Sequence, residues 1–182
     1  MTYASRKPVK KTPYTMPDLS LPDSGTWMSE ARKSAHDRLA EYGLPHRRDE
    51  YWKYTDPTTL TSAEALQAAL FDSKGERPFI GIDRLKLVFV DGVFSAEMSD
   101  DPTLAGVEIE HLSTAAQSDI HWASGLYGQL EAKGQRPVVR PMASLNTAMA
   151  TEGFVIRVTG QAARPICFIY LHQDETSDAT IH

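Results

Sequence analysis

Residues 140–172 change from a helical period to a strand period at one glycine, and this change constrains the fold more than any other part of the sequence. Apolar residues recur at i, i+3 and i+7 between residues 142 and 149, and Pro141 suits a first helical position because it needs no amide hydrogen. Beyond Gly153, residues 154–158 and 166–171 are rich in β-branched and aromatic side chains, as strands are. Two short strands joined by a turn cannot bury both faces alone, so they need further partners.

An amphipathic helix is predicted to begin near Thr26 and to stop at Gly43, with Pro45 beyond it. Its expected buried face consists of Trp27, Ala31, Ala35, Leu39 and Tyr42, while Arg32, Lys33, Asp37 and Arg38 lie largely off that face. The tryptophan is interpreted as an anchor in the core or against a partner.

Several shorter elements are predicted between this helix and residue 139. A capping box at residues 61–64 favours a second helix ending near Asp72. Residues 85–94 predict a hairpin, because Asp91-Gly92 suits a two-residue turn that requires positive φ angles. Residues 107–111 alternate as a third strand with one wet face, and a helical stretch runs from residue 114 to about 133, with breaks at Gly125 and Gly128.

Three segments together resemble one known family. They are Gly43-Leu-Pro-His-Arg-Arg-Asp-Glu-Tyr-Trp-Lys-Tyr-Thr, Leu87-Val-Phe-Val-Asp-Gly-Val-Phe-Ser, and Ala143-Ser-Leu-Asn-Thr-Ala followed by Gly153-Phe-Val-Ile-Arg-Val and Arg164-Pro-Ile. In this order they resemble the N-terminal portion of the SufB/SufD family, which belongs to the SUF system of iron–sulfur cluster assembly. The first two segments are closer to its SufD branch.

The resemblance implies an α+β fold, in which a mixed helical and small-sheet domain leads into the first strands of a β-helix. We expect a basic, proline-rich lead-in (residues 1–25), an N-terminal α/β domain (26–139) and the truncated start of the β-helix (140–182). The resemblance also implies a non-catalytic scaffold subunit. Its partners, a SufB-like paralogue and a SufC-like ATPase, are expected to bind the part of the family's chain that follows these residues. Because residues 166–171 have no obvious following strand, we expect the exposed β edges to self-associate.

The composition and the N-terminal sequence predict the cellular compartment. No run approaches the roughly 20 apolar residues that cross a bilayer, so no membrane is expected. The N-terminus lacks the apolar core of a secretion signal, and the single Cys167 cannot form an internal disulfide, so the cytoplasm is predicted. The formal net charge is −5, yet four basic residues precede the first acidic one (Arg6, Lys7, Lys10 and Lys11, before Asp18). This tail is interpreted as solvated.

The sequence motifs predict no catalytic, cofactor-binding or metal-binding residue. The sequence has no glycine-rich loop ending in Gly-Lys-Ser/Thr, and Ser124-Gly125 lacks the flanking glycines of a nucleophile elbow. The six histidines (36, 46, 111, 121, 172 and 182) show no helical ligand spacing. Cys167 lies in an apolar run and is interpreted as a core thiol rather than a cluster ligand. The neighbouring carboxylates Asp49-Glu50 and Asp100-Asp101 make poor acid–base pairs.

One alternative function remains open. Residues 47–54 combine Arg47 and Arg48 with Tyr51, Trp52 and Tyr54, which together with the basic tail could bind a nucleotide or a single-stranded nucleic acid. The competing interpretation has Trp52 and Tyr54 pin a short helical turn to the body while Arg and Lys stems cover their faces. That interpretation is preferred, and no nucleic acid is expected.

Overall fold

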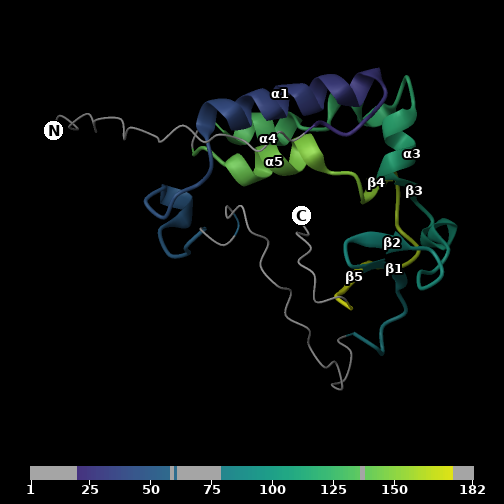
Figure 1. The fold of residues 1–182 in the computed structure, drawn as a ribbon. Helices are drawn as coiled ribbons and strands as arrows, with labels where there is room; N and C mark the ends of the chain where they lie inside the picture. The colour runs from purple at the N-terminus through teal and green to yellow at the C-terminus, as the bar shows by residue number, and fades with distance from the viewer. Residues whose placement is uncertain (1–19, 58–59, 61–78, 136–137, 174–182) are drawn as a thin grey trace.

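In the computed structural model, which describes residues 20–57, 60, 79–135 and 138–173, the helices form a layer beside two small sheets (Figure 1). The long helix α1 (Thr26–Tyr42) packs along α5 (Pro141–Met149), and α4 (Gln129–Gly134) packs on α5. Gly43 ends α1 with a φ of 70°, and its N–H donates to the Leu39 carbonyl. The sequence predicted both ends of α1, and it also predicted Pro141 in the first turn of α5. Residues 1–19 of the predicted lead-in (1–25), the predicted helix at residues 61–72 and the last nine residues fall outside this description.

The larger sheet has the strand order β2-β1-β5. Strands β1 (Leu85–Val90) and β2 (Val93–Ser95) form the predicted antiparallel hairpin, whose turn has φ values of 47° at Asp91 and 83° at Gly92. Strand β5 (Ile166–Leu171) lies on the other side of β1 and runs parallel to it along all six residues. The hairpin therefore forms locally, and its open side is covered by a much later segment.

The smaller sheet joins β3 (Glu108–His111) to β4 (Phe154–Arg157) in antiparallel register, with Glu108 opposite Arg157 and His111 opposite Phe154. One core lies between the sheets, where Leu85, Leu87 and Ala105 are buried against side chains that include Ile109 and Phe154. A second core joins the sheets to the helices through Met28, Leu112 and Ala116. The α+β class is thus confirmed, and the division into domains stays a prediction.

The region after β3 differs from its prediction in detail. In place of a helical stretch beginning at residue 114, the chain forms three separate pieces: α3 (Leu112–Gln117), the 3-10 helix η3 (Trp122–Gly125) and α4. Gly128 has a φ of 72° directly before α4, so the predicted break there is confirmed. Two other short 3-10 helices are η1 (Glu50–Trp52) and η2 (Pro102–Ala105).

Two expectations about burial and pairing are wrong. Arg32, expected off the buried face of α1, is only 2% exposed, because its guanidinium donates to the carbonyls of Pro22 (3.0 Å) and Ala150 (2.6 Å). The second concerns β5, which was expected to lack a partner. Strand β1 supplies one, since Leu85 N–H donates to Pro165 and Asp91 N–H to Leu171 at the two ends of the ladder.

Candidate functional site: a groove beside β3

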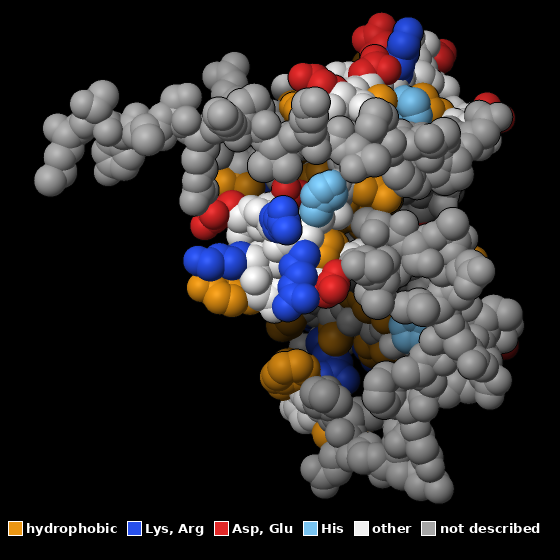
Figure 2. Space-filling view, turned by 60° about the vertical axis from the view of Figure 1, so that its left-hand side comes forward, with side chains coloured by type: hydrophobic (Ala, Val, Ile, Leu, Met, Phe, Trp, Pro, Cys, Tyr) orange, Lys and Arg blue, Asp and Glu red, His pale blue; other side chains and the backbone are white. Residues whose placement is uncertain are grey.

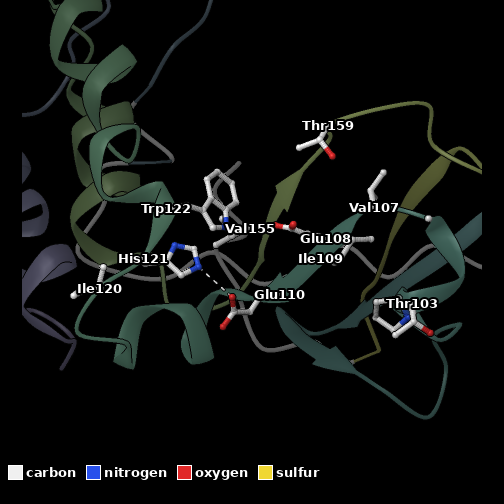
Figure 3. A pocket seen from close by; sticks show the side chains of 12 residues that line it. Thr103, Val107, Glu108, Ile109, Glu110, Ile120, His121, Trp122, Val155 and Thr159 are labelled. Carbon is white, nitrogen blue, oxygen red and sulfur yellow. Dashed lines mark hydrogen bonds and ion pairs between the residues drawn. The ribbon is translucent and has the colours of Figure 1, made fainter.

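A groove of about 760 Å³ runs beside β3. Residues 106–110 line it continuously, η2 contributes Thr103, β4 contributes Val155, and the segment 120–122 forms one end. Figure 3 shows His121 and Trp122 at that end and Thr103 and Val107 at the other. The groove is concave and combines polar and apolar side chains, so it is the first place to look for a binding site.

The two faces of the β3–β4 sheet differ, because side chains alternate along a strand. Ile109 and Phe154 point into the core between the sheets. On the opposite face, Glu108 forms an ion pair with Arg157 (3.6 Å), and both side chains are about half exposed. Glu110 lies on that same face with a side chain that is 39% exposed. The groove therefore has an acidic floor only partly neutralised by one arginine.

His121, at one end of the groove, makes contacts through both ring nitrogens and through the face of its ring. Its Nδ1 accepts a hydrogen bond from the Ala123 N–H (3.1 Å), which caps η3. A nitrogen that accepts carries no proton, so the other nitrogen, Nε2, carries it and donates to Oε2 of Glu110 (3.1 Å). The ring also stacks on Trp27 with 5.2 Å between centroids. With both nitrogens occupied and 8% exposure, this histidine is a structural group.

His111 repeats the same arrangement at the start of α3. Its Nδ1 accepts from the Ser113 N–H (3.3 Å), and its Nε2 lies 3.1 Å from Oε2 of Glu152. That same carboxylate oxygen accepts from the Phe94 N–H (3.1 Å). Each histidine thus caps a short helix and ties it to a carboxylate on another segment.

A third carboxylate, Glu131, organises the helical layer. It accepts from the guanidinium of Arg38 on α1, from the Ser144 hydroxyl on α5 (2.7 Å) and from the Gln135 amide (2.6 Å). Burial alone raises the pKa of Glu131, but these hydrogen bonds and the charge of Arg38 together hold that pKa below its usual value. Glu131 is consequently ionised and fully engaged, so it is not available as an acid or base.

The buried Arg32 has Tyr127 as a neighbour. Burial lowers the pKa of Arg32, and Tyr127 opposes that shift. Burial likewise raises the pKa of Tyr127, whose hydroxyl donates to the Thr147 carbonyl (2.8 Å). Among the buried side-chain nitrogen and oxygen atoms of the described residues, Nε of Arg32 is the one without a hydrogen-bond partner. The guanidinium joins the segment before α1 to the end of α5 through carbonyls, which is a structural role.

The aromatic and basic cluster at residues 47–54 lies on the surface. Arg47, Arg48 and Tyr51 are exposed, and Tyr54 is 90% exposed, so the expectation that Tyr54 pins this segment to the body is wrong. The contact with the body comes instead from Arg140, whose guanidinium lies 4.8 Å from the centre of the Tyr51 ring. Figure 2 brings this end of the molecule forward and shows Lys and Arg side chains gathered beside hydrophobic ones.

The other candidates do not converge. Ser124 is exposed, and within the described residues its hydroxyl has no hydrogen-bond partner that could serve as a base. Cys167 is half-buried at the sheet edge, so it is less enclosed than the core thiol that was expected. No group of three or more His, Cys, Asp or Glu side chains suited to a metal ion occurs in the part of the chain that the structure describes.

The paired carboxylates serve as local hydrogen-bond acceptors. Asp49 accepts from the His46 N–H (2.9 Å), and Asp100 accepts from the Lys86 N–H (2.8 Å). Asp101 caps η2, and hydrogen bonds from the Thr103 N–H and hydroxyl lower the pKa of Asp101. Neither pair is arranged for general acid–base catalysis.

The groove itself was missed at the level of sequence. One signal for it was visible: Glu108 and Glu110 alternate along a predicted strand, so they had to share a face. The end formed by His121 and Trp122 gave no signal, because it depends on stacking against Trp27, which is remote in sequence. Among the described residues, no helix is long and apolar enough to cross a bilayer.

Taken together, the structure is an α+β domain with a groove beside β3, and the charged groups around that groove mostly bind one another. Residues 18–165 match the family model described as the SufBD protein N-terminal region. The chain belongs to the SufBD family, and it carries that region.

Two curated relatives agree with this assignment. The iron–sulfur cluster assembly protein SufD of Escherichia coli (strain K12) is 27% identical over 143 residues, covering 71% of this chain and 34% of SufD. An iron–sulfur cluster assembly SufBD family protein of Synechocystis sp. is 26% identical over 147 residues, covering 77% of this chain and 31% of that protein. The chain thus spans about a third of the length of these relatives.

Proposed function

We propose that this chain is the N-terminal part of a non-catalytic, SufD-like scaffold subunit that takes part in iron–sulfur cluster assembly. The match of residues 18–165 to the SufBD N-terminal region carries the proposal. In the proposed complex, a SufB-like paralogue and a SufC-like ATPase bind the full-length protein, and this region supports the β-helix that begins at β4 and β5. The cytoplasm is the proposed location.

The environment of the polar side chains supports a scaffold. His111, His121 and Glu131 have the residue types used in proton transfer, yet each is committed to two or more structural hydrogen bonds. A general base must instead reach the proton of a bound substrate. The lone Cys167 also falls short of the four thiolates that commonly hold a cluster.

The chain alone tests the non-catalytic part of the proposal. Purified protein is mixed with ferrous iron, sulfide and ATP under anaerobic, reducing conditions, and both the visible absorbance and the release of phosphate are followed. We expect no stoichiometric cluster absorbance and no ATP turnover, because the residues that the structure describes assemble no metal site and the sequence has no phosphate-binding loop. Cluster formation or turnover by this chain would overturn the assignment. Cys167→Ser is the matched control for any colour that does form.

A second candidate is a module that binds a nucleotide or a single-stranded nucleic acid. The exposure of Tyr54, with Lys53 Nζ 5.3 Å from its ring centre and with Arg47 and Arg48 exposed nearby, favours it. Stacking on exposed rings and contacts with phosphates would produce micromolar binding that weakens steeply with salt. The scaffold proposal predicts no such binding, so a salt titration with a labelled single-stranded oligonucleotide distinguishes the two.

A further inference from the structure

The groove beside β3 carries negative charge that the residues around it do not balance. Glu108 pairs with Arg157 through Oε2 (3.6 Å), and Glu110 accepts from His121 through Oε2 (3.1 Å). The two glutamate side chains are 63% and 39% exposed, and among the described residues no hydrogen bond to either Oε1 is found. The described residues that line the groove include no Lys or Arg. The groove therefore attracts a positively charged group.

The end of the groove near η3 offers an apolar surface. Ile120 and Trp122 both line the groove, and they are 92% and 37% exposed. The Trp122 ring lies 5.3 Å from the ring of His121, which in turn stacks on Trp27 of α1 at 5.2 Å. Figure 3 shows Ile120, His121 and Trp122 together at this end. Large apolar side chains that are held in place yet open to solvent beside a groove are typical of binding surfaces.

The size and direction of the groove suit an extended peptide. Its volume of about 760 Å³ lies within the range of about 300–1,000 Å³ that is usual for ligand sites. The groove follows β3, and the five residues 106–110 that line it span about 16 Å. Alternate side chains of an extended segment lie about 7 Å apart on one face. Such a segment can therefore present an apolar side chain to Trp122 and a basic one to Glu110.

We propose that this groove is the docking site for an extended segment of a partner protein. In that segment, one Lys or Arg side chain pairs with Glu110, and an apolar side chain two residues away packs on Ile120 and Trp122. Charge complementarity selects this partner, because an acidic segment or a phosphate backbone would meet Glu108 and Glu110 as like charges. The docking site adds a partner to the proposed scaffold but rests on the groove alone, so its failure would leave the family assignment and the scaffold proposal standing.

Fluorescence anisotropy with synthetic peptides tests the chemistry of the partner. The probe is the fluorescein-labelled, end-capped peptide Gly-Leu-Ser-Lys-Ser-Leu-Gly, whose Leu, Lys and Leu share one face when the peptide is extended. We expect it to bind the full 182-residue chain with a Kd on the order of 0.1 mM. A peptide with Glu in place of Lys, and one with Ser in place of both Leu, should each bind at least about tenfold more weakly.

Two variants with matched controls locate the site. Glu110→Gln keeps an oxygen that accepts from His121 but removes the charge, so we expect it to weaken binding of the lysine peptide at least about fivefold. Ile120→Ser, at a position where the fold buries little, should weaken it to a similar extent, about fivefold. Glu41→Gln and Leu130→Ser make comparable changes at exposed positions that do not line the groove, and both should bind the peptide as the wild type does.

Every other result counts against the proposal. A lysine peptide that does not bind, or that binds no better than the glutamate peptide, would show that the groove does not select a basic segment. Equal losses in Glu110→Gln and Glu41→Gln would assign the binding to net charge, and no loss in either groove variant would place the peptide elsewhere. A Trp122 indole signal in ¹⁵N-labelled protein that shifts on hundredfold dilution without peptide would assign the groove to a second copy of the chain.

Discussion

The helical layer and the sheet layer of this molecule are held together by different interactions. Between the helices, the contacts that fix position are buried polar groups. Glu131 joins α1, α4 and α5, and Arg32 of α1 bonds with the segment before α1 and with the end of α5. Between the sheets the contacts are aromatic, with Phe94 and Phe154 in edge contact at 4.8 Å and Phe89 near both.

This difference predicts two kinds of response to substitution. A buried polar group leaves its partners without hydrogen bonds when it is removed, so its loss is costly. An aromatic cluster can shift and refill part of the space, so its losses are smaller and graded. The helical layer should therefore be the more sensitive half of the molecule, and the following experiments measure that contrast.

The largest effect is expected for Glu131→Ala. This substitution leaves the Arg38 guanidinium and the buried Ser144 hydroxyl without their acceptor, and we expect the free energy of unfolding to fall by about 3–5 kcal/mol. Urea denaturation followed by circular dichroism measures it. Glu41→Ala, at an exposed position of α1, is the control and should change stability by less than about 0.5 kcal/mol. Similar losses for the two variants would remove the contrast.

Arg32→Met should have the next largest effect. Methionine retains much of the side-chain volume but leaves the carbonyls of Pro22 and Ala150 without their donor, so we expect a loss of about 2 kcal/mol. The same denaturation experiment applies, with the exposed neighbour changed in Lys33→Met as the control. A neutral or stabilising result would mean that the desolvation free energy of the buried guanidinium is at least as large as the stabilisation from its hydrogen bonds.

Phe154→Leu tests the sheet layer. The leucine keeps an apolar side chain between Phe89 and Phe94 but loses the edge contacts of the ring, so a loss of about 1 kcal/mol is expected. Thermal unfolding of this variant is compared with that of Phe168→Leu, at a position that is 41% exposed and should matter less. A loss from Phe154→Leu larger than that from Glu131→Ala would reverse the comparison between the layers.

The smallest effect is expected on the loss of stability at acidic pH. The folded-state pKa of Glu131 is depressed, so the ionised Glu131 adds to the free energy of unfolding. This contribution is complete above the ordinary carboxyl pKa, about 4.3, and is lost as pH falls through the folded-state pKa. Unfolding free energies measured from pH 6 to pH 3 should decline in the wild type. Glu131→Gln, which cannot ionise, should decline with a shallower slope. Parallel slopes in the two proteins would show that Glu131 does not contribute to the acid sensitivity.

The sequence predicted the local elements well, because local rules decide them. The positive φ values of Asp91 and Gly92 follow from the hairpin, and the ends of α1 follow from its flanking glycine and its periodicity. The burial of Arg32 could not be predicted, since its partners Pro22 and Ala150 are brought together only by tertiary packing. The same reason applies to β5, whose sequence favours a strand but does not specify which strand it joins.

The site was the least predictable part. Histidines at 111 and 121 are widely spaced and so gave no ligand pattern, and their shared role as helix caps depends on Glu152 and Glu110 reaching them from other segments. The groove requires α1 to lie against the segment around His121, a contact between positions far apart in the chain. Periodicity can place a side chain on a face, but only packing decides what that face meets.

The parallel pairing of β1 with β5 has a consequence for the order of events during synthesis. Leu85 lies opposite Ile166, about 80 residues later, so the chain must close a long loop before this ladder can form. The β1–β2 hairpin leaves the ribosome first and waits with one edge of β1 uncovered until Leu171 has been made. That interval exposes an unpaired apolar strand to other nascent chains, and it is when a chaperone would help this protein most.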